Sequence, residues 1–146
     1  MSLPDYDNLE VEEKWCDERR VDVADYLKRE GVTHCRIGDW PAWHIAPYVS
    51  IWAIESAKRP EWIGWWVISG DLPTDYVSAD TVKHPRDAVR VIAERWREIS
   101  DYMNRGEKHP TMNIGSLDTW PELGPLLHSR AQLLAKWVED DSVWED

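Results

Sequence analysis

Two neighbouring apolar segments restrict the fold of this chain more than any other feature. Residues 48–55 and 62–69 carry apolar side chains on both faces of an extended chain. Strands of this kind are covered on both sides or lie in the centre of a sheet. The six residues between them, 56–61, suit a hairpin loop. An alternating segment, 32–37, precedes them, and the three strands together predict an antiparallel meander.

Three further segments have the periodicity of amphipathic helices. The first covers residues 8–30 and the second residues 85–104, while the last begins at Pro121 or Pro125 and ends at 138. Helices and sheets must bury their apolar faces against one another. The order of elements therefore predicts an α+β fold with a leading helix, a three-stranded antiparallel meander and two C-terminal helices packed on the sheet.

The negative charge of the chain is concentrated at its two ends. The net charge is -11, of which residues 1–30 and 139–146 each carry -5. A protein that binds nucleic-acid phosphates needs the opposite sign, and a mimic of DNA needs acids over a whole face. We therefore expect no nucleic-acid partner. No repeat or linker divides the chain, so we expect a single domain over 1–146, with frayed acidic ends at 1–7 and 139–146.

The sequence also excludes several classes of site. No apolar run approaches the ~20 residues that span a bilayer, and the acidic N-terminus is unlike a signal peptide, so no membrane association is expected. Cys16 and Cys35 are expected to be small buried side chains in a reducing, cytoplasmic setting. The histidines lack the spacing of metal ligands, and no phosphate loop or nucleophile elbow is present. We expect no metal, no cofactor and no assignable catalytic residue.

The candidate site is the segment 69–77, where a buried strand ends in a polar turn. The side chains that this turn offers to a ligand are Asp71, Thr74, Asp75 and Tyr76. Stiff turns at strand ends often build binding sites. The acids could instead bond only to nearby backbone N–H groups, or one of them could act in acid–base catalysis with a histidine such as His44. All three interpretations stay open.

The last helix carries a cation in the middle of its apolar face, at Arg130. A buried guanidinium requires a carboxylate, unless the side chain reaches solvent at the rim. The acids at the end of the buried strand are the best placed to supply one. We therefore predict an ion pair between Arg130 and Asp71 or Asp75.

The aromatic residues are unusual, with eleven Trp and no Phe. Most Trp lie on predicted apolar faces, where they replace Phe in the core. Trp40 and Trp43 lie in an irregular segment that contains Pro41, and they could form a surface for a ligand or partner. A Trp-rich face of the sheet could also be the interface of a homodimer.

The run WVISGDLPTD at 66–75 resembles the bacterial domain-of-unknown-function family 4826. The resemblance extends over most of the chain, through APYVSIW at 46–52, Trp15, Tyr26-Leu27, Arg130-Ala131 and Leu134. It implies a small cytosolic bacterial protein with no assigned activity. The chain departs from the family pattern in its Trp content and at 38–43 and 106–116, so a role for Trp40 or Trp43 would be peculiar to this protein.

These observations predict a non-catalytic binding or adaptor module for a protein or small-molecule partner. Its site would lie where the 69–77 turn meets the last helix. One alternative is a small hydrolase that uses Asp71 or Asp75 with a histidine, and another is a structural homodimer held by Trp side chains. An enzyme requires a concave pocket with convergent titratable groups, whereas an adaptor requires an exposed apolar patch or groove.

Overall fold

The computed structural model describes residues 5–111 and 117–144. It forms two compact units, Met1–Pro85 and Arg86–Asp146. The first unit contains the leading helix and the sheet, and the second contains the C-terminal helices. The predicted single domain remains a prediction. Within the described ranges, no helix has both the length and the apolar character needed to cross a membrane.

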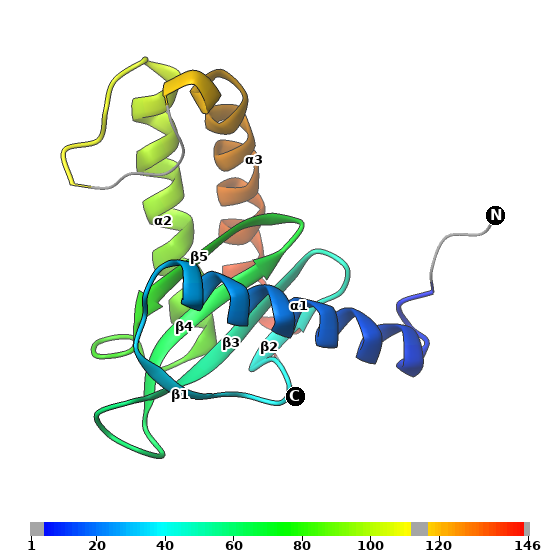
Figure 1. The fold of residues 1–146 in the computed structure, drawn as a ribbon. Coiled ribbons are helices and arrows are strands. Elements are labelled where there is room, and N and C mark those ends of the chain that lie inside the picture. The colour runs from blue at the N-terminus through cyan, green and yellow to red at the C-terminus, as the bar shows by residue number, and fades with distance from the viewer. Residues whose placement is uncertain (1–4, 112–116, 145–146) are drawn as a thin grey trace. The chain divides into compact units, whose positions relative to one another are not determined.

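The first unit combines one helix with an antiparallel sheet of five strands (Figure 1). Its elements are α1 (Leu9–Arg29), β1 (His34–Ile37), β2 (Trp43–Ile45), β3 (Val49–Ser56), β4 (Ile63–Gly70) and β5 (Leu72–Ser78). The strand order is β1-β3-β4-β5. Strand β2 pairs with the beginning of β3, and β1 pairs with its end. The α+β class, the leading helix and the antiparallel sheet are confirmed.

The predicted three-stranded meander is wrong in its number of strands, because the sequence predicts connections where the structure has β2 and β5. Both lie in segments rich in Pro, Gly and Asp, which favour turns. Strand β5 tolerates Pro73 because it lies at the end of the strand order, where a missing backbone donor does not interrupt the sheet. The segment 69–77 is therefore a tight hairpin followed by a strand rather than a polar turn.

Helix α1 begins and ends close to its predicted bounds. Its first turn is capped by Asn8, whose side chain accepts hydrogen bonds from the N–H groups of Glu10 and Val11. Gly31, with a φ of 66°, follows its last residues. The helix crosses one face of the sheet (Figure 1). The buried core beneath it consists of Val23, Tyr26, Leu27, Ile37, Trp52, Ile54 and Val67.

The register assigns neighbouring residues to opposite faces of the sheet. Trp52 pairs with Val67, and Val67 pairs with Tyr76, so these three side chains share the face that α1 covers. Ile68 pairs with Asp75, and both face away from α1 because successive side chains in a strand alternate. This alternation decides which of the predicted site residues lie near the helix.

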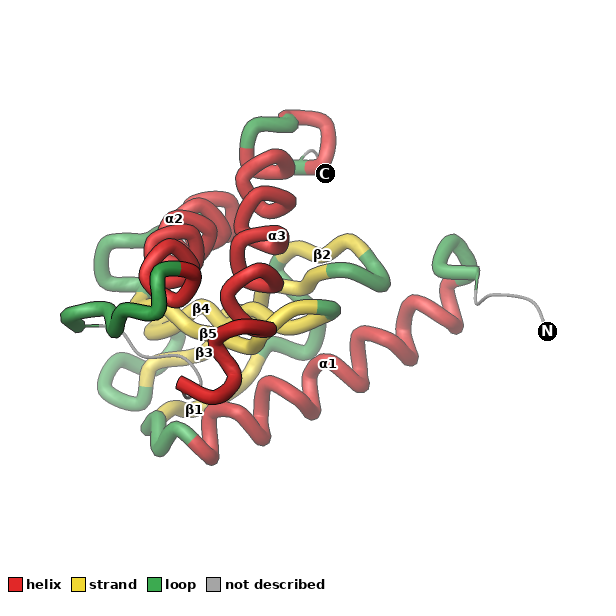
Figure 2. Tube along the Cα trace, turned by 90° about the horizontal axis from the view of Figure 1, so that it is seen from above, coloured by secondary structure: helices red, strands yellow, loops and turns green. Residues whose placement is uncertain are grey.

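The second unit is an antiparallel pair of helices, α2 (Pro85–Asn104) and α3 (Trp120–Val138), seen side by side in Figure 2. At one end, the Nε of Arg86 donates a hydrogen bond to the carbonyl of Val138 at 2.8 Å. At the other end, Gly124 lies against Met103 and Asn104. The predicted bounds of α2 are confirmed, and α3 begins one residue before the earlier of its two predicted starts.

The acidic C-terminal segment is attached to this helix pair over its described part. Asp141–Val143 forms a 3-10 helix, and Asp141 accepts a hydrogen bond from Arg86 at 2.7 Å. The indole Nε1 of Trp144 donates to the carbonyl of Trp137 at 2.8 Å. The fraying expected at 1–7 and 139–146 includes residues 1–4 and 145–146, which lie outside the described residues, and it remains a prediction.

Candidate functional site

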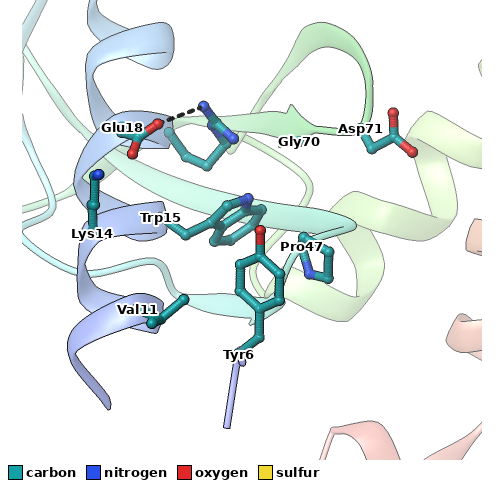
Figure 3. Close-up of a pocket in the computed structure, with 9 residues that line it drawn as sticks. Tyr6, Val11, Lys14, Trp15, Glu18, Pro47, Gly70 and Asp71 are labelled. Carbon is teal, nitrogen blue, oxygen red and sulfur yellow. Dashed lines mark ion pairs between the residues drawn. The ribbon is translucent and has the colours of Figure 1, made fainter. Parts of the chain in front are cut away.

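A pocket of about 600 Å³ lies beside the first half of α1 (Figure 3). Its residues come from the chain before α1, from α1 itself, from the turn before β3 and from the β4–β5 hairpin. They are Tyr6, Val11, Lys14, Trp15, Glu18, Arg19, Pro47, Gly70 and Asp71. The α1 residues are spaced by three and four positions, which places them on one side of the helix.

Trp15 forms the aromatic wall of this pocket. Its side chain is 6% exposed, and in Figure 3 the indole lies between α1 and Pro47. The guanidinium of Arg19 lies 5.5 Å from the centroid of the indole ring. An indole face attracts cations and also packs against apolar groups. This wall therefore suits a ligand that carries a cationic or an apolar group.

Charges of both signs surround the aromatic wall. Arg19 bonds to Asp22 through its Nε at 2.8 Å, and another of its nitrogens lies 3.9 Å from Glu18. Lys14 makes no ion pair within the described part of the chain. Figure 3 shows Asp71 on the opposite side of the pocket from Lys14. The pocket therefore presents an ammonium group and a carboxylate on its two sides.

The β4–β5 hairpin holds Asp71 at the edge of the pocket. Gly70 has a φ of 150°, which residues with a side chain rarely adopt. The N–H of Asp71 donates a hydrogen bond to the carbonyl of Tyr48 at 2.9 Å. The hairpin is thereby fixed against the residues that immediately precede β3.

The four predicted site residues of segment 69–77 lie in different environments. Asp75 is buried on the face of the sheet away from α1, so its carboxylate and that of Asp71 do not form a pair suited to acid–base chemistry. Thr74 lies near the charged second half of α1, which contains Asp25 and Lys28. Tyr76 packs under α1, with its ring edge-on to that of Tyr26 at 5.8 Å.

His44 lies next to the pocket but is oriented by a different carboxylate. Its Nε2 is 3.1 Å from Glu12 Oε2, and its ring stacks 6.3 Å from that of Trp15. Trp40 is 44% exposed, and its ring meets that of His44 edge-on at 5.4 Å. Trp43 is half-buried and pairs with Ile51, on the other face of the sheet from His44. The predicted site residues that gather around the first half of α1 are thus Asp71, His44 and Trp40.

Arg130 is a half-buried residue of α3 in the second unit, whereas Asp71 and Asp75 belong to the first. The predicted ion pair between them remains a prediction.

The contribution of α1 to this pocket is not predicted from the sequence. Lys14, Glu18 and Arg19 are not among the predicted site residues, and neither is Glu12, which orients His44. Their spacing around Trp15 was the only sequence signal that a ligand could lie there. Within residues 5–111 and 117–144, no group of three or more His, Cys, Asp or Glu side chains is arranged to hold a metal ion.

The two cysteines differ in environment. Cys16 is buried in α1, and burial, with a smaller contribution from Glu12, raises the pKa of its thiol to about 12. The prediction that Cys35 is buried is wrong, because the side chain is exposed on β1. Strand β1 is short and only Ile37 in it is buried.

We expect a disulfide reagent at neutral pH to modify Cys35 rapidly and Cys16 only after unfolding, because thiolate and access are both required. Spectroscopic titration of free thiols would count one fast group in the native protein. Cys35→Ser should abolish that fast phase and Cys16→Ser should leave it intact. Two fast thiols in the native protein would contradict the burial of Cys16.

Comparison with known proteins identifies a family. The family described as "Domain of unknown function (DUF4826)" matches residues 10–144. No curated protein and no solved structure matches the chain.

Proposed function

The chain belongs to this family of unknown function, and we propose that it is a non-catalytic binding module whose ligand occupies the pocket beside α1. This pocket replaces the predicted meeting point of the 69–77 segment and the last helix as the location of the site. The ligand class that fits best is a small zwitterion with an apolar side chain, such as a free amino acid or a short peptide.

The observation that carries this proposal is the arrangement of opposite charges around an aromatic wall. Lys14 and Arg19 on α1 offer donors to a carboxylate, and Asp71 on the hairpin offers an acceptor to an ammonium group. Trp15 and Pro47 between them supply apolar surface. The volume of about 600 Å³ lies within the range of small-molecule sites.

The proposal is tested by calorimetric titration of the full chain with leucine and the dipeptide Gly-Leu. Lys14→Gln and Asp71→Asn should each weaken binding about tenfold, because each removes one charge-assisted hydrogen bond. Leucinamide and N-acetyl-leucine, which lack one charge each, should bind more weakly than leucine. Lys28→Gln, on the same helix but outside the pocket, is the matched control and should bind as the unmodified protein does.

Equal binding by leucine, leucinamide and N-acetyl-leucine would contradict the recognition of a zwitterion. Absence of binding by both probes would contradict the proposed ligand class.

A hydrolytic enzyme is the second candidate, and the contact between His44 and Glu12 favours it. A histidine oriented by a carboxylate can act as a general base. Its partner here is Glu12 rather than Asp71 or Asp75. Hydrolysis of an activated ester that His44→Gln abolishes would favour this candidate over a binding module.

An adaptor role or a structural homodimer would use exposed apolar side chains instead of the pocket. In the first unit the large ones include Trp40, Tyr48, Trp62 and Ile63. Sedimentation at increasing protein concentration would separate a homodimer from a monomeric binding module. We place the protein in the bacterial cytoplasm, a proposal supported by its two free thiols.

A further inference from the structure

A second pocket, of about 310 Å³, lies between α2 and α3 within the second unit. Its floor is made of small side chains, Ala93 on α2 and Ala131 and Ala135 on α3. Their size leaves an apolar groove between the helices where larger residues would fill the space. The volume is at the lower end of the range for small-molecule sites.

The charged groups of this groove are separated along its length. The helices are antiparallel, so the beginning of α2 lies beside the end of α3. Arg97 and His128 consequently lie toward one end of the groove, and Glu139 toward the other. Glu94 lies between these ends, next to Arg90, whose guanidinium already bonds to Asp87.

Arg97 is distinguished by its lack of a partner. Among the arginines of the described residues, it is the only one whose side chain has no ion pair, hydrogen bond or ring contact. Asp101, four residues later on the same helix, does not pair with it. A guanidinium beside an apolar groove is suited to a planar carboxylate.

His128 provides a second unused polar group at the same end. Its Nδ1 is buried and makes no hydrogen bond within the part of the chain that the structure describes. Buried polar atoms are nearly always bonded, and an exception calls for an explanation. An imidazole beside Arg97 can donate to an anion in the groove.

We propose that the groove between α2 and α3 binds a small organic acid with an unbranched apolar body. The carboxylate pairs with Arg97 and accepts from His128, and the apolar body lies on the alanine floor. This site is independent of the pocket beside α1, because every residue that lines it belongs to the second unit.

The test is a titration of the isotope-labelled full chain with octanoate, followed by amide chemical shifts. Octanoate should shift the amides of the alanine floor in a saturable way. Octanamide, which has the same body without the charge, should bind about tenfold more weakly, the effect of one charge-assisted hydrogen bond. Arg97→Gln should weaken octanoate binding by a similar factor.

Two further variants distinguish a loss of octanoate binding from a loss of the fold. Ala135 is exposed, so Ala135→Leu should leave the fold intact while it fills the groove and abolishes the shifts. Arg105→Gln, directly after α2 and outside the groove, should bind octanoate as the unmodified protein does. Equal binding of octanoate and octanamide, full binding by Ala135→Leu, or no shift at millimolar octanoate would overturn the proposal. Lys14→Gln should have no effect on this titration.

Discussion

Trp52→Ala is expected to lower the free energy of unfolding by about 3–5 kcal/mol, the usual cost of truncating a large buried aromatic side chain. Trp52 is fully buried in the core beneath α1. Its indole Nε1 donates a hydrogen bond to Ser50 Oγ at 2.9 Å, and that hydroxyl donates to the carbonyl of Ser69 at 2.8 Å. The substitution therefore opens a cavity and also removes the donor to a buried hydroxyl.

The two contributions can be separated by a double-mutant cycle in urea denaturation. Trp52→Phe retains most of the apolar volume and loses the donor. Ser50→Ala leaves the indole N–H buried without an acceptor, which costs about 1–3 kcal/mol. The double variant should lose less than the sum of the single losses, because both hydrogen-bonding partners are then absent.

Trp62→Ala is the matched control for the loss of an indole. Trp62 is 56% exposed, and its ring contacts Arg59. Its truncation should cost under about 1 kcal/mol. A similar cost for Trp52→Ala and Trp62→Ala would contradict the packing described for the core.

These two Trp residues show what the sequence could predict about the core. Trp52 and Trp62 both lie in segments that are apolar on both faces, so the pattern predicted burial for each. Trp62 lies next to the β3–β4 loop, outside the covered part of the sheet. The strand pattern predicts the two central strands, but it does not define where the layer that covers them ends.

Helices were easier to predict than strands because their signals are local. The cap of α1 and the periodicity of both α1 and α2 are contained within each segment, so the bounds of these helices follow from the sequence. Strand β2 has three residues, too few for a pattern. Strand β5 begins with residues typical of a turn, and only its pairing with β4 makes it a strand.

The sequence predicts only part of the candidate site, because only some of its residues carry a local signal. Asp71 was selected because a polar residue after a buried strand is a local signal. The opposing Lys14 is more than fifty positions away in the sequence, and its place opposite Asp71 follows only from the packing of α1 on the sheet. The sequence predicts a long turn that holds Asp71 and Asp75 together, whereas the structure has a tight hairpin, and the alternation of side chains in β5 separates the two carboxylates.

Gly70→Ala is expected to destabilise the protein by about 3 kcal/mol or more and to abolish ligand binding in the pocket beside α1. The φ of 150° at Gly70 is unfavourable for alanine. A Cβ at this position would also overlap the carbonyl oxygen of Tyr48 and lie 3.0 Å from the Cα of Val49. Both neighbours are backbone atoms of the adjacent strand region, so neither can move aside as a flexible side chain would.

The control for backbone strain alone is Gly31→Ala. Gly31 also has a positive φ, of 66°, but none of the described residues lies within 4 Å of an added Cβ. Alanine there should cost about 1–2 kcal/mol, the penalty of the left-handed conformation, and leave ligand binding unchanged. Urea denaturation and leucine titration of both variants would separate the two effects.

Because the N–H of Asp71 bonds to the same Tyr48 carbonyl that an added Cβ would displace, loss of stability and loss of binding should occur together in Gly70→Ala but not in Gly31→Ala. A Gly70→Ala variant as stable as Gly31→Ala would show that the hairpin can move away from β3, and that Asp71 is not held in place by this contact.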